Sequence, residues 1–386
     1  MDLRDIRVLD LTRLLPGPYA TQLLADMGAD VVKIEDTGAG DYARDMEPTT
    51  DRGVGAVFDA VNRGKRSVAV DLKREGGREA FYALAEEADA VIEGFRPGVV
   101  DRLGVDHDTL RAHNPGIVYC SLTGYGQTGP EADRAGHDIN YIGRAGLLDA
   151  TRAGPDARPV VPGYQVADLA GGLFAAFGVV SALLSREHTG EGTYVDVGMA
   201  DVVLSFSQSL ASQSLAGDDP RPGETPLTGG YPWYDVYEAA DGEYVTLAAL
   251  EPQFWRAFCE AVGRGDLIDA HMTEDPDELA ALREALADVF RTRPRGEWVE
   301  AFRGVDGTVD GVYSPREAVR DPQFEARGMI ERGDGAPPRL GFPAVADLPD
   351  GDERVPGHGE HTDEVLRGAG LAAEHVAALR ETGAVK

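Results

Sequence analysis

Short β-rich runs alternate with amphipathic stretches through the first half of the chain. The predicted strands are Arg7–Asp10, Asp30–Glu35, Ser67–Leu72, Ala90–Glu93, Ile117–Leu122 and Tyr194–Val197. The predicted helices between them are Tyr19–Met27, Gly77–Glu87, His107–Arg111 and Asp168–Arg186. Because strands and helices alternate, this half of the chain predicts an α/β fold, in which crossover helices connect parallel strands.

The pattern changes after about Ser205. Two strand-like runs, Trp233–Tyr237 and Glu243–Leu247, flank Asp241-Gly242, a pair that is typical of hairpin turns. Helical periodicity then follows at Pro252–Val262, Asp277–Arg291 and Arg295–Phe302. These elements predict a second, α+β domain. Beyond it, residues 335–359 are rich in Gly, Pro and Asp and predict a linker, followed by a short helix at His361–Arg367.

The net charge of the chain limits the classes of molecule that it can bind. The 386 residues include 67 acidic and 37 basic ones, which gives a formal net charge of -30. Nucleic-acid binding and docking on anionic membranes both need a basic surface, so the composition argues against both. Only four of the cations are lysines, namely Lys33, Lys65, Lys73 and Lys386. Acid excess with arginine in place of lysine indicates a protein kept soluble in high salt, where screening weakens self-repulsion.

The two cysteines, Cys120 and Cys259, form neither a disulfide framework nor a zinc-binding pattern. The first residues lack the apolar core of a signal peptide, and the apolar stretch Leu169–Leu184 is short for a membrane span. We therefore expect a cytoplasmic protein.

A glycine-rich sequence follows the fifth predicted strand. Gly124 to Gly129 matches G-x-G-x-x-G, the pattern of dinucleotide-binding turns. That pattern requires its last glycine to open a helix, but Pro130 follows it and no apolar periodicity resumes before Ile139. We reject a dinucleotide site here.

Three side chains near predicted helix starts are candidates for proton transfer, and each has a plain structural alternative. His137 stands next to a carboxylate after a glycine-rich turn, but it equally fits a loop histidine that caps a helix. Asp168 fits a helix N-cap, although Gly171 and Gly172 would leave the first turn open for backbone N–H groups to stabilise an oxyanion. Glu251 precedes a proline and also fits a cap.

Cations are concentrated early in this acidic chain. Such a concentration indicates either a small anionic ligand, such as a phosphorylated one, or a solvated surface. The residues concerned are Lys33, Lys65, Lys73, Arg63, Arg66, Arg74, Arg96 and Arg102.

Taken together, these segments resemble the family III coenzyme A transferases, and within them most closely the racemases that act on alpha-methylacyl-CoA. The family-wide segments are 15–18, 28–35, 62–67, 94–98, 124–130 and 359–366. Three further segments resemble the racemase subgroup, namely 136–141 (Gly-His-Asp-Ile-Asn-Tyr), 229–232 and 251–254.

The resemblance implies a set of site residues and a substrate. It implies His137 and Asp168 as a catalytic pair on opposite faces of the substrate α-carbon, with Glu251 next to His137. The substrate would be an acyl-CoA thioester, with no metal and no separate cofactor. The implied coenzyme A contacts are Val70, Asp71, Leu72, Lys73, Gly94, Phe95, Arg96, Arg102, Gly136, Asp138, Ile139, Asn140 and Tyr141.

The implied fold is an interlocked homodimer. Each chain has a large Rossmann-like domain with a parallel sheet, built from both chain ends, and a smaller α+β domain. The expected bounds are 1–200 for the first part of the large domain, 201–228 for a linker, 229–330 for the small domain, and 331–386 for the return linker and the rest of the large domain.

Residue types and resemblance together favour inversion of the α-carbon of 2-methylacyl-CoA thioesters through an enolate. The alternatives are a CoA-transferase in which Asp168 is the nucleophile, and a non-catalytic homologue that binds CoA thioesters. One departure supports the transferase alternative. Racemases commonly place an arginine shortly after the second strand, where this chain has Asp36 and then Gly40-Asp41-x-x-Arg44. The departure leaves open which residue meets the nucleotide end of coenzyme A, and Arg44 is one candidate.

Overall fold

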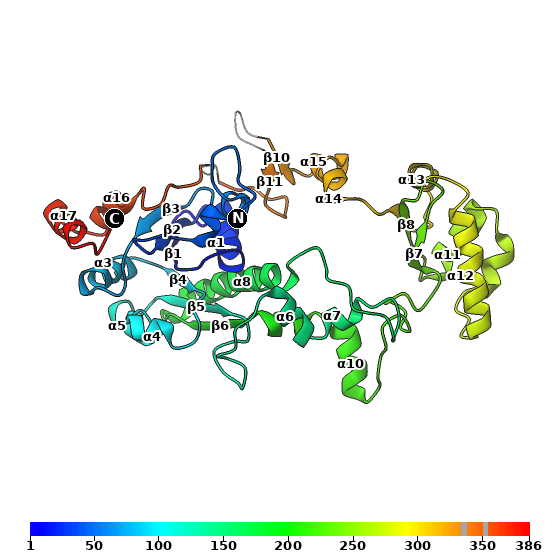
Figure 1. Cartoon of the computed structure of the whole chain (residues 1–386), viewed down its shortest axis with the longest axis horizontal. Coiled ribbons are helices and arrows are strands. Elements are labelled where there is room, and N and C mark those ends of the chain that lie inside the picture. The colour runs from blue at the N-terminus through cyan, green and yellow to red at the C-terminus, as the bar shows by residue number, and fades with distance from the viewer. Residues whose placement is uncertain (333–337, 350–353) are drawn as a thin grey trace. The chain divides into compact units, whose positions relative to one another are not determined.

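A computed structural model of the chain describes residues 1–332, 338–349 and 354–386. It contains two compact units (Figure 1). The first unit comprises Met1–Ala145, Gly163–Phe206 and Arg327–Lys386, and the second comprises Gly146–Pro162 and Ser207–Ala326. The first unit is therefore assembled from segments on both sides of the second in the sequence.

A six-stranded parallel sheet forms the centre of the first unit. Its strands are β1 (Arg7–Asp10), β2 (Asp30–Glu35), β3 (Arg66–Ala69), β4 (Ala90–Glu93), β5 (Val118–Thr123) and β6 (Tyr194–Gly198). The spatial order is β3-β2-β1-β4-β5-β6, and every neighbouring pair is parallel. The predicted α/β class and Rossmann-like sheet are confirmed. Because the chain leaves β1 toward both edges, the carboxyl ends of β1 and β4 form the crevice where α/β sheets bind ligands.

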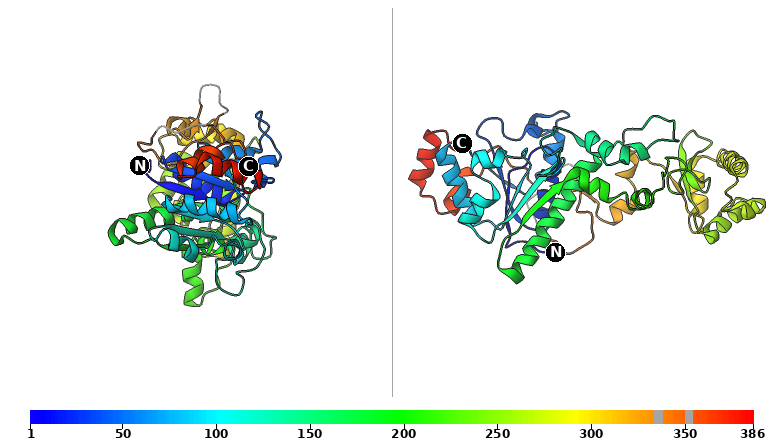
Figure 2. Two further views of the ribbon diagram at one scale, coloured as in Figure 1. Left: turned by 90° about the vertical axis from the view of Figure 1, so that its left-hand side faces the viewer. Right: turned by 90° about the horizontal axis from the view of Figure 1, so that it is seen from below.

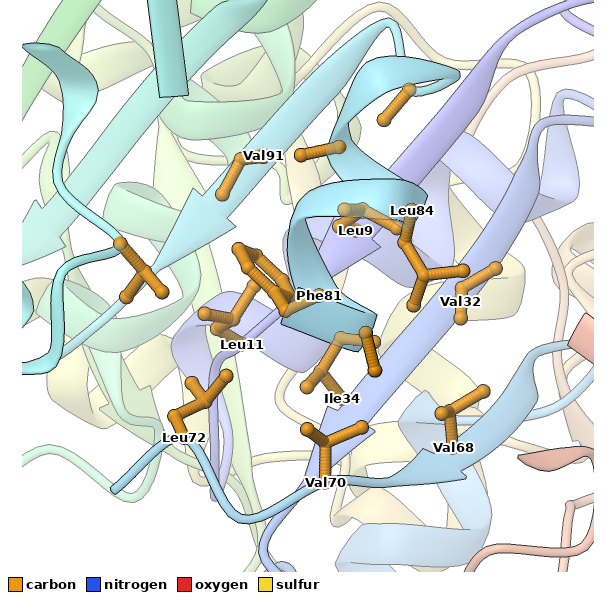
Figure 3. Packing of buried hydrophobic residues seen from close by; sticks show 14 of the residues in the cluster. Leu9, Leu11, Val32, Ile34, Val68, Val70, Leu72, Phe81, Leu84 and Val91 are labelled. Carbon is orange, nitrogen blue, oxygen red and sulfur yellow. The ribbon is translucent and has the colours of Figure 1, made fainter. Parts of the chain in front are cut away.

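Helix α3 (Glu75–Glu86) shows how one face of the sheet is covered. Its buried positions recur three and four residues apart, which places Phe81 and Leu84 on one side of the helix. Figure 3 shows these side chains packed against Leu9, Val32 and Val91 from three neighbouring strands. Apolar residues of further helices complete this core, from α4 (Val99–Leu103), α5 (His107–His113), α16 (Thr362–Gly368) and α17 (Ala373–Glu381).

Helix α8 (Val166–Thr189) is the longest helix in the described residues, and it contacts α1 (Pro16–Asp26), β5 and β6. It extends beyond the predicted bounds and is long and apolar enough to cross a membrane by length and composition. That is weak support for a span, because a core helix of a soluble protein passes the same test. Gly171 and Gly172 let α8 pack closely, since a Cβ there would meet the Met199 side chain and the Pro16 carbonyl.

The segment near residue 385 completes the edge of the sheet. Strand β3 ends at Ala69, short of the predicted Leu72, because Val70 pairs with Val385 in an isolated antiparallel bridge. The Asp71 N–H donates to the Ala384 carbonyl at 2.9 Å. Helices α16 and α17, red in Figures 1 and 2, bring this segment beside α3. The turn after β3 is thus held by residues far away in the sequence.

The second unit contains an antiparallel sheet of β7 (Tyr234–Glu238), β8 (Tyr244–Ala248) and β9 (Val309–Gly311). The predicted hairpin at Asp241-Gly242 joins β7 and β8, and Gly242 has the positive φ that this turn requires. Its core is aromatic, with Trp233, Trp255 and Trp298 fully buried. The helices against it include α11 (Pro252–Ala261), α12 (Pro276–Phe290) and α13 (Arg295–Phe302).

The predicted linker at 201–228 is not irregular throughout. It contains the end of α9 (Met199–Ser205) and all of α10 (Gln208–Ala216), which are too short to give a clear periodic signal.

Parts of the predicted return linker, at 333–337 and 350–353, lie outside the described residues. The other elements are α2 (Ala56–Val61), α6 (Asp138–Arg144), α7 (Leu147–Ala150), α14 (Pro315–Ala318), α15 (Pro322–Ala326), β10 (Ile330–Glu331), β11 (Arg339–Leu340) and the 3₁₀ turns η1 (Tyr42–Asp45) and η2 (Gly265–Ala270).

A buried ionic network lies beneath the carboxyl end of β1. The Lys65 ammonium donates to Asp10 Oδ2 at 3.2 Å, to Thr21 Oγ1 at 2.7 Å and to Asn62 Oδ1 at 2.9 Å. The Lys33 ammonium lies 4.0 Å from the same Asp10 oxygen. Burial opposes ionisation of Asp10, but the two ammonium charges hold its pKa below its usual range. Burial lowers the pKa of Lys65 to about 8.

Removing one partner of this network is expected to destabilise the fold strongly. Lys65→Met would leave the buried Asp10 carboxylate with only one ammonium partner, Lys33, which is 4.0 Å away and also pairs with Asp41 at 2.9 Å. Removing one partner of a buried ion pair costs about 3–5 kcal/mol. The midpoint of urea unfolding measures the loss. The matched control is Lys73→Met at an exposed lysine, which should change stability by no more than about 0.5 kcal/mol. Equal midpoints for the two variants would contradict the role of the network.

Candidate active site

Two connected grooves lie over the carboxyl ends of the central strands. The β2 groove, of about 490 Å³, is lined by residues 34–38, which include the end of β2, and by the turn 70–73 after β3. The β4 groove, of about 750 Å³, is lined by the loops after β1, β4 and β5 and by residues that include Asp168. The two grooves share five lining residues, Leu11, Arg13, Tyr42, Phe95 and Val99. This is the crevice that the strand order predicts.

Asp168 lies in the first turn of α8 and lines the β4 groove. Burial raises the pKa of its carboxyl to about 6, and the nearby Asp138 carboxylate acts in the same direction. A positive charge on His137, which lines the same groove, opposes this rise. A half-buried carboxyl with a raised pKa is suited to taking up and returning protons, and its ionised form can act as a nucleophile.

His137 immediately precedes α6, so the helix considered in the sequence begins at Asp138. The His137 side chain is exposed and lines the β4 groove. Its loop is fixed from two sides. The His137 N–H donates to Asn140 Oδ1 at 3.0 Å, and the Tyr141 hydroxyl donates to the Gly136 carbonyl at 2.6 Å. Gly124 and Gly136 make room for this tyrosine, because a Cβ at either position would collide with its ring.

Asp138 connects the segments that carry the two candidate catalytic residues, His137 and Asp168. Its Oδ1 accepts hydrogen bonds from the backbone N–H groups of Ala167 at 2.6 Å and Asp168 at 3.2 Å. Asp138 therefore caps α8, and the expectation that Asp168 is its N-cap is wrong, because Gln165 occupies that position.

The expected oxyanion site at the start of α8 is also wrong. The N–H groups of Ala167 and Asp168, the second and third of the helix, already donate to Asp138. Gly171 and Gly172 provide close packing against Met199 and Pro16, so they do not leave the turn open to a ligand.

Glu251 is an exposed residue of the second unit, at the N-cap of α11. Its side chain makes no capping hydrogen bond, although a cap was the structural alternative for this position. Its expected place beside His137 stays a prediction.

Most of the residues implied for coenzyme A lie along the two grooves. The turn Val70–Lys73 lines the β2 groove, and Phe95 lines both grooves. The implied residues in the β4 groove are Gly94, Phe95, Arg96, Gly136, Asn140 and Tyr141. Arg102, Asp138 and Ile139 line neither groove within the described part of the chain, since Arg102 is exposed on α4 and Asp138 caps α8.

The early cations are mostly committed to internal ion pairs, so neither a shared ligand nor a solvated surface explains them as a group. Lys33 and Lys65 are buried, and Arg63 pairs with Asp26 at 2.8 Å. Arg66 and Arg74 also have carboxylate partners, namely Asp30 and Asp71. Among the described residues, Lys73, Arg96 and Arg102 are exposed and have no ion-pair partner.

Arg44 does not replace the missing arginine. Its guanidinium binds Glu35 through two hydrogen bonds, of 2.8 and 2.6 Å, and its side chain is only 11% exposed. Burial favours the neutral form of Glu35, but Arg44 overcomes this and lowers its pKa to about 2. Arg44 is therefore not available as that substitute, because its pair with Glu35 fixes the loop after β2.

Arg13 is a groove residue that sequence reasoning missed. It lines both grooves, donates to Asp36 Oδ2 and to the Tyr42 hydroxyl at 3.2 Å each, and lies 5.8 Å from the Phe95 ring centre. The loop that carries it is held in place, with Leu14 at φ 66° in the left-handed region. The available signal was a cation in the loop after the first strand, whose carboxyl end borders the crevice in this strand order.

Glu93 was also missed. It is buried at the end of β4, and its Oε2 accepts from the Phe95 N–H at 2.7 Å. Burial raises its pKa to about 7. Glu93 thus positions the loop that carries Phe95 and Arg96.

Comparison with known proteins places this site in a family. Residues 3–362 match the profile of CoA-transferase family III. Alpha-methylacyl-CoA racemase of Homo sapiens is 33% identical over 97% of this chain and 95% of that protein. Succinyl-CoA:mesaconate CoA-transferase of Haloarcula marismortui is 37% identical over 96% of each. A solved CAIB/BAIF family protein from Brucella suis has a TM-score of 0.83 at 33% identity, covering 95% of this chain and 99% of that one.

Proposed function

We propose that this chain, which belongs to CoA-transferase family III, is a racemase that inverts the α-carbon of 2-methylacyl-CoA thioesters. The family membership confirms the resemblance seen in the sequence. One observation carries the proposed reaction: the His137 imidazole and the Asp168 carboxyl line the same groove at the ligand-binding edge of the sheet. Such a pair provides both the base and the acid that inversion needs.

The proposed reaction is two proton transfers. For one epimer, the Asp168 carboxylate accepts the α-proton, and the C–H electron pair forms an enolate whose charge rests on the thioester oxygen. The His137 imidazolium then donates a proton to the opposite face of the α-carbon. In the other direction the neutral imidazole is the base and the protonated Asp168 is the acid, so each turnover takes one proton and returns one.

Coenzyme A transfer is the second candidate, and the 37% identity to a succinyl-CoA:mesaconate CoA-transferase favours it. In that reaction the Asp168 carboxylate attacks the thioester carbonyl, forms an acyl anhydride and releases coenzyme A thiolate. The thiolate attacks the Asp168 carbonyl of the anhydride, which releases the first carboxylic acid and leaves an aspartyl-CoA thioester. The carboxylate of the second acid displaces the thiolate from this thioester to form a new anhydride. The thiolate then attacks the acyl carbonyl of that anhydride, which gives the new acyl-CoA and frees the Asp168 carboxylate. The candidate needs no proton transfer at the α-carbon, and therefore gives His137 no essential role.

One experiment separates the candidates. The protein is incubated in deuterated water with a single epimer of a 2-methylacyl-CoA and no free acid. Racemisation predicts deuterium at the α-carbon together with the other epimer. Transfer predicts no exchange, and movement of coenzyme A from a donor thioester to added succinate or mesaconate. Exchange without the other epimer, or no exchange with several 2-methylacyl groups, would contradict the racemase.

The pH dependence should follow Asp168. Its ionised form is the base for one epimer, and it is lost as pH falls through the pKa of about 6. We expect kcat/KM for that epimer to fall about tenfold per pH unit below 6, whereas an ordinary aspartate would begin to lose activity near pH 4. Initial rates with each epimer from pH 4.5 to 8 measure this limb. A kcat/KM that stays constant down to pH 4.5 would contradict the raised pKa.

We also propose that the two grooves hold coenzyme A, with Lys73 and Arg96 as phosphate partners. Each is exposed and unpaired among the described residues, so each is available to a diphosphate. Lys73→Ala should raise KM for the thioester about tenfold with little change in kcat. The control is Lys386→Ala, outside both grooves. A fall in kcat at constant KM would contradict a binding role.

The resemblance further implies a homodimer, and we propose that a second copy covers part of α8. Leu173, Phe177 and Leu184 of this helix are 48%, 65% and 63% exposed, which is unusual for large apolar side chains on one helix. Sedimentation at micromolar concentration should show a dimer. Phe177→Glu should shift it toward the monomer, and a monomeric wild type would contradict the proposal.

A further inference from the structure

An acidic side chain stands where the β2 groove meets the end of β2. Asp36 is the first residue after this strand, and its carboxylate lines the groove with the side chain 42% exposed. Its Oδ1 accepts from the Gly38 N–H at 2.8 Å, and its Oδ2 accepts from Arg13 at 3.2 Å. These bonds orient the carboxylate and leave further lone pairs toward the groove.

The same position has an established role in the dinucleotide-binding sheets that share this strand order. An acidic residue at the end of the second strand accepts hydrogen bonds from ribose hydroxyls, whereas an arginine nearby accommodates a phosphate on that ribose. Here the nearby arginine, Arg13, is already bonded to Asp36 itself. The Arg13–Asp36 pair is therefore suited to binding a ribose hydroxyl and poorly suited to binding a phosphate on that ribose.

The other charged residues that line the β2 groove also disfavour binding of a phosphate on the ribose. Its other lining carboxylates, Glu35 and Asp71, have arginine partners at 2.6 and 3.2 Å. Lys73 is the one lining cation of the groove that has no acidic partner in the described segments. Coenzyme A carries a diphosphate and a separate phosphate on its ribose. If Lys73 and Arg96 bind the diphosphate, as proposed above, no unpaired lysine or arginine remains among the described lining residues of either groove for the phosphate on the ribose.

From these contacts we infer that the β2 groove binds the adenosine ribose through its hydroxyl at Asp36 and does not select for the 3′-phosphate. The chain therefore accepts thioesters of coenzyme A and of 3′-dephospho-coenzyme A with similar efficiency. This inference rests on the proposed binding of acyl-CoA in the grooves, but it holds for either reaction at Asp168.

The test compares the two nucleotides directly. Isothermal titration with coenzyme A and with 3′-dephospho-coenzyme A, at one fixed salt concentration, needs no knowledge of the acyl group. For the wild type we expect dissociation constants within about threefold of each other. Asp36→Arg places an unshared guanidinium at the groove and should create a preference of at least about tenfold for coenzyme A, while Asp36→Asn should create none.

A charge control accompanies the variants. Asp288→Arg makes the same change of charge at a side chain 82% exposed in the second unit, and should leave the ratio of dissociation constants at its wild-type value. Two results would overturn this inference and leave the proposed function standing. One is a wild-type preference above about thirtyfold for coenzyme A. The other is an Asp36→Arg variant whose ratio of dissociation constants equals that of the wild type. Binding of neither nucleotide would overturn the proposed function together with it.

Discussion

Replacing Asp168 with asparagine is expected to lower kcat at least about 10³-fold. The amide can neither accept the α-proton nor attack a thioester, so the loss should appear in deuterium exchange and in coenzyme A transfer alike. The decrease in kcat should approach the largest decreases seen when a general base is removed, because the half-buried carboxyl lies in the same groove as His137. The measurement is kcat for each reaction at saturating thioester.

The variant should remain folded, since Asp138 caps α8 through backbone N–H groups that this substitution leaves in place. Equal thermal unfolding of variant and wild type checks this. Full activity of Asp168→Asn would exclude both candidate reactions. Loss of transfer with intact inversion would make Asp168 a nucleophile and remove it from the racemase mechanism.

Replacing His137 with glutamine is expected to abolish inversion, with a loss of about 10²–10⁴-fold. Asp168 remains, so the α-proton on its side of the substrate should still exchange with solvent, while reprotonation on the other face is lost. The result is deuterium incorporation into one epimer without formation of the other. Mass spectrometry combined with chiral separation of the acyl group measures both quantities.

His113 offers a matched control for this substitution. It is a histidine on α5 that lies 3.3 Å from the Glu86 carboxylate, outside both grooves, so His113→Gln should keep full activity. Unchanged inversion in His137→Gln would remove this histidine from the mechanism. Coenzyme A transfer that survives the substitution would support the transferase candidate.

The strands were the most predictable part of the fold. β1, β2 and β4 have the predicted bounds, because their apolar runs are buried in the centre of a sheet. Short helices were missed for the opposite reason. α2 has six residues, and α17 buries only Val376 and Leu379, so neither shows a clear apolar period.

Parts of the site were visible in the sequence because chemistry-bearing residues follow glycine-rich turns. His137 and Asp168 do line one groove. The sequence could not show that Asp138 joins them, because that contact spans two helices that pack only in the folded unit. It also could not show that Lys65 is bound to Asp10 inside the core, because their proximity depends on the order of strands in the sheet.

The pairing of Val385 with Val70 has a consequence for synthesis of the chain. All six strands of the sheet have left the ribosome soon after Gly198, but residues 207–326 of the second unit are made before residue 385. At about 5–20 residues per second this interval lasts roughly 10–40 s. During this interval the edge of the sheet at β3 lacks its pairing with Val385, so it can pair with other strands. The turn that carries Lys73 also lacks its hydrogen bond to the Ala384 carbonyl. We therefore expect the edge at β3 to be prone to wrong pairing until residue 385 is made, and the β2 groove to be completed only then.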